Sequence, residues 1–350
     1  HSVMMQEKKG MMKVWNMVLV ASTFFLCIFG TFLTRSGVVQ SVHAFAQSSL
    51  GKYFVVFLAT GIASTVYLLL NRLEYLKSEA QLESVLSRES SFLFNNLILL
   101  ASCFAVLWGT LFPVISEAVT GEKISVDGPF FNRVNIPIGL GLLLLTGVGP
   151  LIAWRKSSFE SLKRAFLWPT AAGVAVAAVL LATGVRHFYA TMSFALCTFV
   201  TVTVVMEFFK GADAIRAKSG QSLVAAMVEL THRNTRRYGG YLVHMGVVIM
   251  FIGFTGKAFD LNQTLQVEKG QTVKLGSYAL TIGDVESGRN ENYSWEVLNV
   301  AVAKNGQSLG NMRPERRMYF ASRQPTSEVT IRRRAIEDLY LNFAGAANDG

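Results

Sequence analysis

Seven stretches of the sequence are each apolar over about 20 residues, the length that an α-helix needs to cross the hydrocarbon core of a membrane. Over the whole chain 51% of the residues are hydrophobic and 16% are charged, whereas a soluble domain carries roughly 25% charged residues. The sequence therefore predicts an all-α, polytopic membrane bundle of about seven transmembrane helices. The expected spans lie near residues 14–33, 52–71, 92–114, 135–154, 166–185, 188–209 and 238–256.

After residue 256 the chain changes character. Short β-rich runs alternate with turn signals such as Lys304-Asn305-Gly306, the pattern of a small, mainly β domain. We therefore expect a transmembrane helical domain over 1–256 and a β-rich domain over 257–350. Within the β-rich part, residues 264–267 are expected to form a strand, and the basic segment Arg313–Arg317 is expected to be solvent-exposed and available to a partner.

The basic residues indicate how the chain crosses the membrane. If the segment before the first apolar run is cytoplasmic, the cytoplasmic segments hold 16 Lys and Arg and the opposite loops hold five. Cytoplasmic loops of membrane proteins carry such an excess. The net charge of +10 is thus explained by topology and does not require nucleic acid as a partner. The β-rich domain is then expected in the periplasm, with the helices in the bacterial inner membrane.

One ionisable side chain, His244, lies inside the last apolar run. Such a group is costly at membrane depth and points to function. Gly240 lies one helical turn before it, and Gly246 belongs to a stripe with Gly239 and Gly253 that would let a helix or a flat ligand approach the backbone. The residues alone leave two interpretations open: a histidine satisfied by a neighbouring helix, or a metal or haem ligand.

Two further histidines stand out by position. At 1.5 Å per helical residue, His1 and His244 both lie roughly 10 Å from the same membrane surface, so they could supply two axial nitrogens to one haem iron. His43 follows the outer end of the first predicted span in an aromatic, apolar setting. Arg35 at that end would suit the carboxylates of a flat macrocycle, because a guanidinium binds carboxylates through two hydrogen bonds.

With these residues in hand, the chain resembles the C-terminal portion of the CcmF/NrfE family, the integral-membrane haem lyases of bacterial System I cytochrome c maturation. Several motifs, spread over essentially the whole chain, carry the resemblance: His1-Ser2-Val3, Gly30-Thr31-Phe32-Leu33-Thr34-Arg35-Ser36-Gly37, Ser41-Val42-His43-Ala44-Phe45, Arg237-Tyr238-Gly239-Gly240-Tyr241, His244-Met245-Gly246 and Pro314-Glu315-Arg316-Arg317-Met318-Tyr319.

The resemblance implies two haem sites. In the family's pattern, His1 and His244 are the axial ligands of a resident b-type haem that acts in iron reduction, with quinol as a candidate electron donor. His43 matches a ligand of the incoming haem, which a CcmE-type chaperone delivers, and Arg35 is a candidate contact for a propionate. That haem is joined by thioethers to the CxxCH motif of apocytochrome c, which CcmH/CcmI-type proteins present.

The chain also departs from the family's pattern. The tryptophan-rich segment, the first periplasmic histidine and the last transmembrane helix of the family are not found, and the sequence begins with His1. We therefore expect a portion of a longer protein that is inactive by itself. The alternatives are a membrane scaffold of the maturation complex, or a transporter-like protein whose buried histidine relays protons without haem chemistry.

Overall fold

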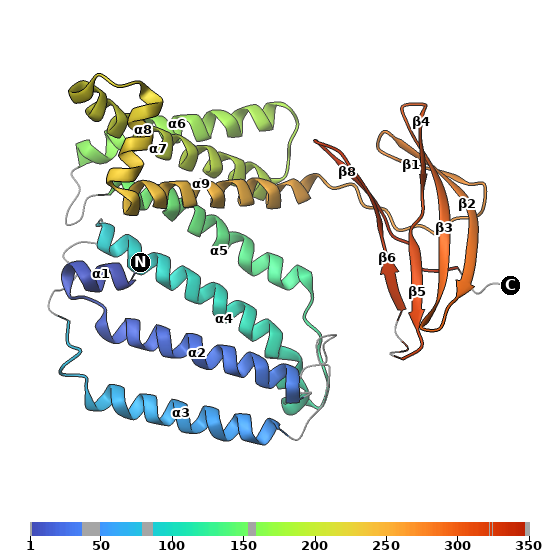
Figure 1. Cartoon of the computed structure of the whole chain (residues 1–350), viewed down its shortest axis with the longest axis horizontal. Helices are drawn as coiled ribbons and strands as arrows, with labels where there is room; N and C mark the ends of the chain where they lie inside the picture. Colours follow the sequence, from blue (N-terminus) through green and yellow to red (C-terminus); the bar gives the residue numbers. More distant parts are fainter. Residues whose placement is uncertain are drawn as a thin grey trace. The chain divides into compact units, whose positions relative to one another are not determined.

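The computed structural model describes residues 2–36, 50–78, 87–152, 159–321, 323 and 325–346. The chain divides into two compact units, one up to Ala258 and one from Phe259 onward, and each is described by itself (Figure 1).

The first unit is helical. Seven of its helices within the described ranges, α2 to α7 and α9, are long and apolar enough to cross a membrane, which confirms the predicted bundle. The helices are α1 (Ser2–Lys9), α2 (Lys13–Ser36), α3 (Gly51–Asn71), α4 (Arg88–Thr120), α5 (Gly128–Val148), α6 (Phe159–Ala182), α7 (Phe188–Ser219), α8 (Leu223–Arg233) and α9 (Thr235–Gly256), with short 3₁₀ turns η1 (Gly149–Leu151) and η2 (Lys257–Phe259).

Helix α7 is the centre of this unit, since α5, α6, α8 and α9 all pack against it. Its Val200 is fully buried, and Phe199 stacks on Phe166 of α6 with ring centroids 6.1 Å apart. Gly147 of α5 lies against these two α7 side chains, and a Cβ there would come within 2.6 Å of the Phe199 ring. Gly147 thus lets α5 pack closely against α7, the helix that α9 also contacts.

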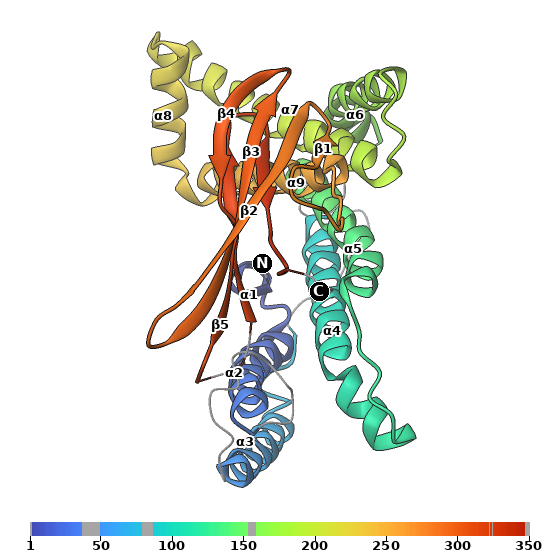
Figure 2. The ribbon, with the colours of Figure 1, turned by 90° about the vertical axis from the view of Figure 1, so that its right-hand side faces the viewer.

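The second unit holds two β-sheets. In the larger sheet the strands run in the order β1-β2-β3-β5-β6, all antiparallel, and β4 also pairs with β3. Figure 2 shows β2, β3 and β5 side by side. The strands are β1 (Thr272–Leu275), β2 (Tyr278–Arg289), β3 (Tyr293–Lys304), β4 (Gln307–Met312), β5 (Glu315–Tyr319), β6 (Pro325–Glu328), β7 (Thr330–Arg333) and β8 (Asp338–Leu341).

Alternation along β2 and β3 builds the core of this unit. Leu280 and Ile282 of β2 point the same way as Val300 and Val302 of β3, because those residues are paired in the register. Leu339 of β8 packs on the same cluster, so the two-stranded β7–β8 sheet covers the face. The expected strand at residues 264–267 is wrong: this stretch has no strand pairing, and its Val267 contributes by packing against the core.

Candidate functional site

The start of α9 is fixed by a polar cluster that involves α7. Asn234 caps the helix, its Oδ1 accepting a hydrogen bond of 3.4 Å from the Arg237 backbone N–H. The Arg237 guanidinium donates to the Tyr241 hydroxyl at 3.0 Å and forms an ion pair with Glu207 of α7. Because the Glu207 side chain is only 12% exposed, this ion pair satisfies a carboxylate that would be costly to bury alone.

Three contacts set the register of α7 against α9. Glu207 pairs with Arg237, the Cys197 thiol lies 3.8 Å from the carbonyl oxygen of Val248, and the Ser193 and Thr255 hydroxyls are 2.6 Å apart. As the α7 residue number falls, the α9 residue number rises, so the two helices run antiparallel, and between the first two contacts the numbers change by almost the same amount. This register brings His244 level with residues 200–201 of α7.

His244 lies one turn beyond Tyr241 on α9. Its ring is half-buried, and its Nδ1 is buried with no hydrogen-bond partner among the described residues. Most buried polar atoms in proteins have a partner, and an exception calls for an explanation. A neighbouring helix that satisfies the imidazole was the plain alternative, and in the described part of the chain no side chain or carbonyl does so.

The glycines of α9 lie on two different faces. At about 100° per residue, Gly240 is about 40° from His244 around the helix, whereas Gly246 is about 160° away. A Cβ at either position would meet nothing within 4 Å. Gly240 therefore leaves open space beside His244, and Gly246 leaves it on the far side of the helix, next to Ile249.

Helix α1 is anchored by contacts with three other helices. The Asn16 side chain of α2 donates to Gln6 Oε1 at 2.6 Å, Lys9 lies 3.6 Å from Glu89 of α4, and Arg236 of α9 lies 3.2 Å from Glu7. The last contact connects the two helical segments on which the sequence predicts haem ligands.

Two of the predicted site residues, His1 and His43, lie outside the described residues. Arg35 is described: it is exposed in the last turn of α2 and makes no ion pair with any described acidic residue. Among the described residues, the structure therefore brings Glu207, Arg237 and Tyr241 together one helical turn from His244. Arg35 is not part of this cluster, because it lies in the last turn of α2.

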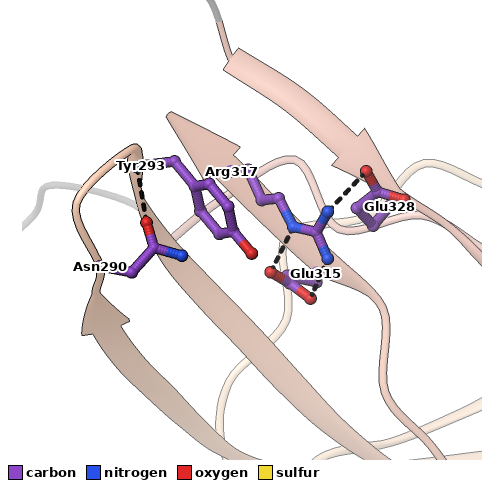
Figure 3. Close-up of polar contacts among 5 residues, drawn as sticks. All are labelled: Asn290, Tyr293, Glu315, Arg317 and Glu328. Carbon is purple, nitrogen blue, oxygen red and sulfur yellow. Dashed lines mark hydrogen bonds and ion pairs between the residues drawn. The ribbon is translucent and has the colours of Figure 1, made fainter. Parts of the chain in front are cut away.

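The β unit contains a second polar cluster, which the sequence analysis missed (Figure 3). The Arg317 guanidinium donates to both Glu315 oxygens, at 2.7 and 3.2 Å, and to Glu328 at 3.1 Å, and it lies 4.9 Å from the centre of the Tyr293 ring. Hydrogen bonds to Glu315 and Tyr319 raise the pKa of Arg317 above its ordinary value.

The neighbouring cations of this segment are also paired. Arg313 lies 2.6 Å from Glu286, and Arg316 lies 4.0 Å from Glu296. Arg313 is exposed, as expected, but each of the three arginines of this segment has an acidic partner on β2, β3, β5 or β6. That this segment is available to a partner stays a prediction.

Comparisons with known proteins agree with this architecture. A family profile described as "CcmF C-terminal beta-sandwich" matches residues 258–350. The chain is 32% identical over 355 residues to the cytochrome c-type biogenesis protein CycK of Rhizobium meliloti, and 30% identical over 354 residues to CcmF of Pseudomonas aeruginosa, covering all of this chain and 52% of each relative. This chain belongs to the CcmF/CycK/NrfE family of cytochrome c biogenesis proteins.

A solved structure shows the same fold as this CcmF-family chain. The structure, titled "Cytochrome c Heme Lyase CcmF", has a TM-score of 0.70 and 22% identity, covering 96% of this chain and 49% of that one. NrfE of Haemophilus influenzae is 26% identical over 365 residues. The chain spans about half the length of the curated relatives it matches. The family resemblance and the fold, seven apolar helices followed by a β-sandwich, are confirmed.

Do the described residues of this CcmF-family chain fit a haem? No group of three or more His, Cys, Asp or Glu in the described part could hold a bare metal ion, but a haem iron takes at most two axial protein ligands. His244 offers an imidazole whose Nδ1 has no partner among the described residues, and Gly240 leaves free space beside it. An imidazole on a bundle helix is a common haem ligand. The described residues therefore fit one side of a haem site.

Proposed function

We propose that this chain contributes to a cytochrome c haem lyase of the holocytochrome c synthase type, a multi-pass protein of the bacterial inner membrane with its β-sandwich in the periplasm, and that by itself it does not complete the reaction. Its substrate haem comes from a CcmE-type chaperone and is joined by thioethers to the CxxCH thiols of apocytochrome c, presented by CcmH/CcmI-type proteins. The observation that carries this proposal is the half-buried His244 imidazole, without a described partner, in a membrane helix of a CcmF-family chain.

In this proposal two histidines hold a resident haem b. His244 and His1 would hold the haem iron through imidazole nitrogens, and Gly240 would leave room for the macrocycle beside His244. When bound, this haem supplies one-electron redox chemistry, for which quinol is the candidate donor. The ion pair between Arg237 and Glu207 keeps α9 in place on α7, so the His244 imidazole would bind the haem iron from a helix whose position is fixed.

The substrate haem is assigned to a different place. His43 positions its iron, and Arg35, exposed at the end of α2, pairs with a propionate. Addition of a thiol to a vinyl group requires the two reactants to be held in the right geometry, and such positioning lowers a barrier without any acid or base from the protein. The proposed roles of His43 and Arg35 are of this kind.

The test is the haem content of the intact protein, purified in mild detergent, and of two histidine variants. We expect a b-type signal in the reduced-minus-oxidised spectrum and in the pyridine haemochrome, with loss of that signal in His244→Ala. His232→Ala is the matched control, because His232 is exposed on α8, and it should keep the full signal.

Two results would count against the proposal. Full haem occupancy with an unchanged spectrum in His244→Ala would show that His244 is not an axial ligand. A well-folded parent protein that contains no haem would instead favour the scaffold alternative, in which the β-sandwich recruits partners without redox chemistry.

A further inference from the structure

The β7–β8 hairpin has one face that nothing in the described structure covers. Ile331 pairs with Tyr340 on this face, and their side chains are 40% and 56% exposed. Ile336 at the tip is 99% exposed. Leu339 points the opposite way and is buried in the core of the β unit, so the hairpin is held firmly while its outer face presents apolar and aromatic groups to the surroundings.

Arg333 lies on this face, directly across from Asp338, and Arg334 follows it; both are exposed, and neither makes an ion pair with any described acidic residue. Arg332 is paired with Leu339 and belongs to the opposite face. The two acids of the hairpin are already engaged. Glu337 forms an ion pair with Lys304 and accepts a hydrogen bond of 2.9 Å from the Tyr278 hydroxyl. Asp338 accepts a hydrogen bond of 3.0 Å from the backbone N–H of Arg334. Arg334 still interacts electrostatically with Glu337, but neither the Arg333 nor the Arg334 guanidinium forms an ion pair with these two acids, so both can bind an external anion.

Chain connectivity tethers the β unit to the last membrane-spanning segment. The last membrane-spanning segment ends at Phe259. Only two residues later, the side chain of Leu261 lies against Gly276, where a Cβ would be 3.2 Å from its Cδ1. Two residues span at most roughly 7 Å. The β unit thus follows the last membrane-spanning segment without a long linker.

We propose that the β7–β8 hairpin is a membrane-surface contact that binds anionic phospholipids. Arg333 and Arg334 would meet the headgroup phosphates, while Ile336 and Tyr340 would enter the boundary between headgroups and acyl chains. Aromatic side chains concentrate at this depth, arginines extend their charged ends to the interface, and clustered cations next to a membrane segment favour anionic lipid. The inference does not depend on haem binding.

The test places a fluorophore at the tip of the hairpin. The intact protein carries an NBD label on Ala335→Cys and is reconstituted into vesicles of phosphatidylcholine, alone or with one-third phosphatidylglycerol. Cys27 and Cys103, which are exposed, are replaced by Ala, and the buried Cys197 stays. We expect a blue-shifted NBD emission that brominated acyl chains quench, more strongly with phosphatidylglycerol and less strongly at high salt.

Charge removal gives the quantitative measure. Each arginine near an anionic surface changes the ratio of membrane-bound to water-exposed hairpin roughly fivefold, so Arg333→Gln with Arg334→Gln should lower this ratio about 25-fold. The matched control removes two exposed cations, Arg289→Gln and Arg323→Gln. Arg289 ends β2 at the opposite end from Tyr278, which contacts the hairpin, so the control should leave the ratio unchanged.

Two outcomes would overturn the proposal. An NBD emission typical of water in both kinds of vesicle would show that the hairpin does not touch the membrane. A blue-shifted emission that is the same in detergent and in both lipids, and insensitive to the arginine substitutions, would mean that the tip is buried against protein instead.

Discussion

The close approach of α6 and α7 predicts that adding one methyl group, by replacing Gly173 of α6 with alanine, destabilises the protein. At Gly173 of α6, an added Cβ would lie 2.8 Å from the backbone oxygen of Ala195 and 3.6 Å from its carbonyl carbon. The obstacle is backbone, so it can yield only if one helix moves. Overpacking of this kind costs about 1–3 kcal/mol of unfolding free energy.

A second glycine provides the matched control. Gly141 of α5 also lies within a membrane helix, but its Cβ would be 3.7 Å from the Ile98 side chain, an ordinary van der Waals contact. Replacing glycine by alanine gains up to about 1 kcal/mol of helix propensity at both positions. The difference between Gly173→Ala and Gly141→Ala therefore isolates the clash with Ala195.

The assay is thermal unfolding of both variants in one detergent, followed by tryptophan fluorescence. At roughly 2–4 °C per kcal/mol, Gly173→Ala should melt about 5 °C below Gly141→Ala, and Gly141→Ala should melt at or above the parent. If Gly173→Ala melted at the same temperature as Gly141→Ala, the two helices would not be in backbone contact at this point, and the packing described for α6 on α7 would be refuted.

Two further predictions concern charged pairs. Arg237→Gln should lower the free energy of unfolding by about 2 kcal/mol, because it leaves the mostly buried Glu207 without its cation. The double variant with Glu207→Gln should recover part of that loss. Additive shifts in melting temperature for the two substitutions would contradict the pairing. Hydrogen bonds from Lys304 and Tyr278 lower the pKa of Glu337 in the folded protein. At a pH above the unfolded-state pKa of about 4.3, the ionised carboxylate therefore stabilises the fold. This stabilisation is lost as the pH falls through the lower folded-state pKa. Glu337→Gln should therefore show a smaller drop in the melting temperature of the β unit between pH 7 and pH 3, measured by circular dichroism, than the parent; an equal drop would count against this role.

The seven membrane helices could be predicted because the bilayer imposes both their length and their composition. Their ends could not be predicted equally well. The apolar run expected at 188–209 belongs to α7, which continues to Ser219 and ends only at Gly220, where the backbone is left-handed with φ of 68°. Apolar composition marks the membrane boundary, whereas the helix itself continues through a charged segment until a residue allows the chain to turn.

Contacts between distant residues were beyond the sequence analysis. Arg237 and Glu207 are 30 residues apart, and nothing in their own segments indicates that they meet. The same holds for two of the contacts of Arg317, because Glu328 of β6 and the Tyr293 ring of β3 reach it only when both strands pair with β5. The sequence shows that a segment is basic, but strand order and register decide which acidic residues pair with its arginines.

The value of His244 as a candidate ligand depends on the azimuth of α9, which hydropathy cannot provide. Polar or thiol contacts with α7 occur at the start, middle and end of α9, through Glu207, Cys197 and Ser193. A helix fixed at three levels cannot rotate without breaking at least one of these contacts. The half-buried orientation of the His244 imidazole is therefore set by the protein, and the open space at Gly240 lies beside it, whereas the equally open space at Gly246 lies on the far side of the helix. Both positions are glycines, so composition alone does not separate them, whereas their angular positions around α9 place only Gly240 on the face of His244.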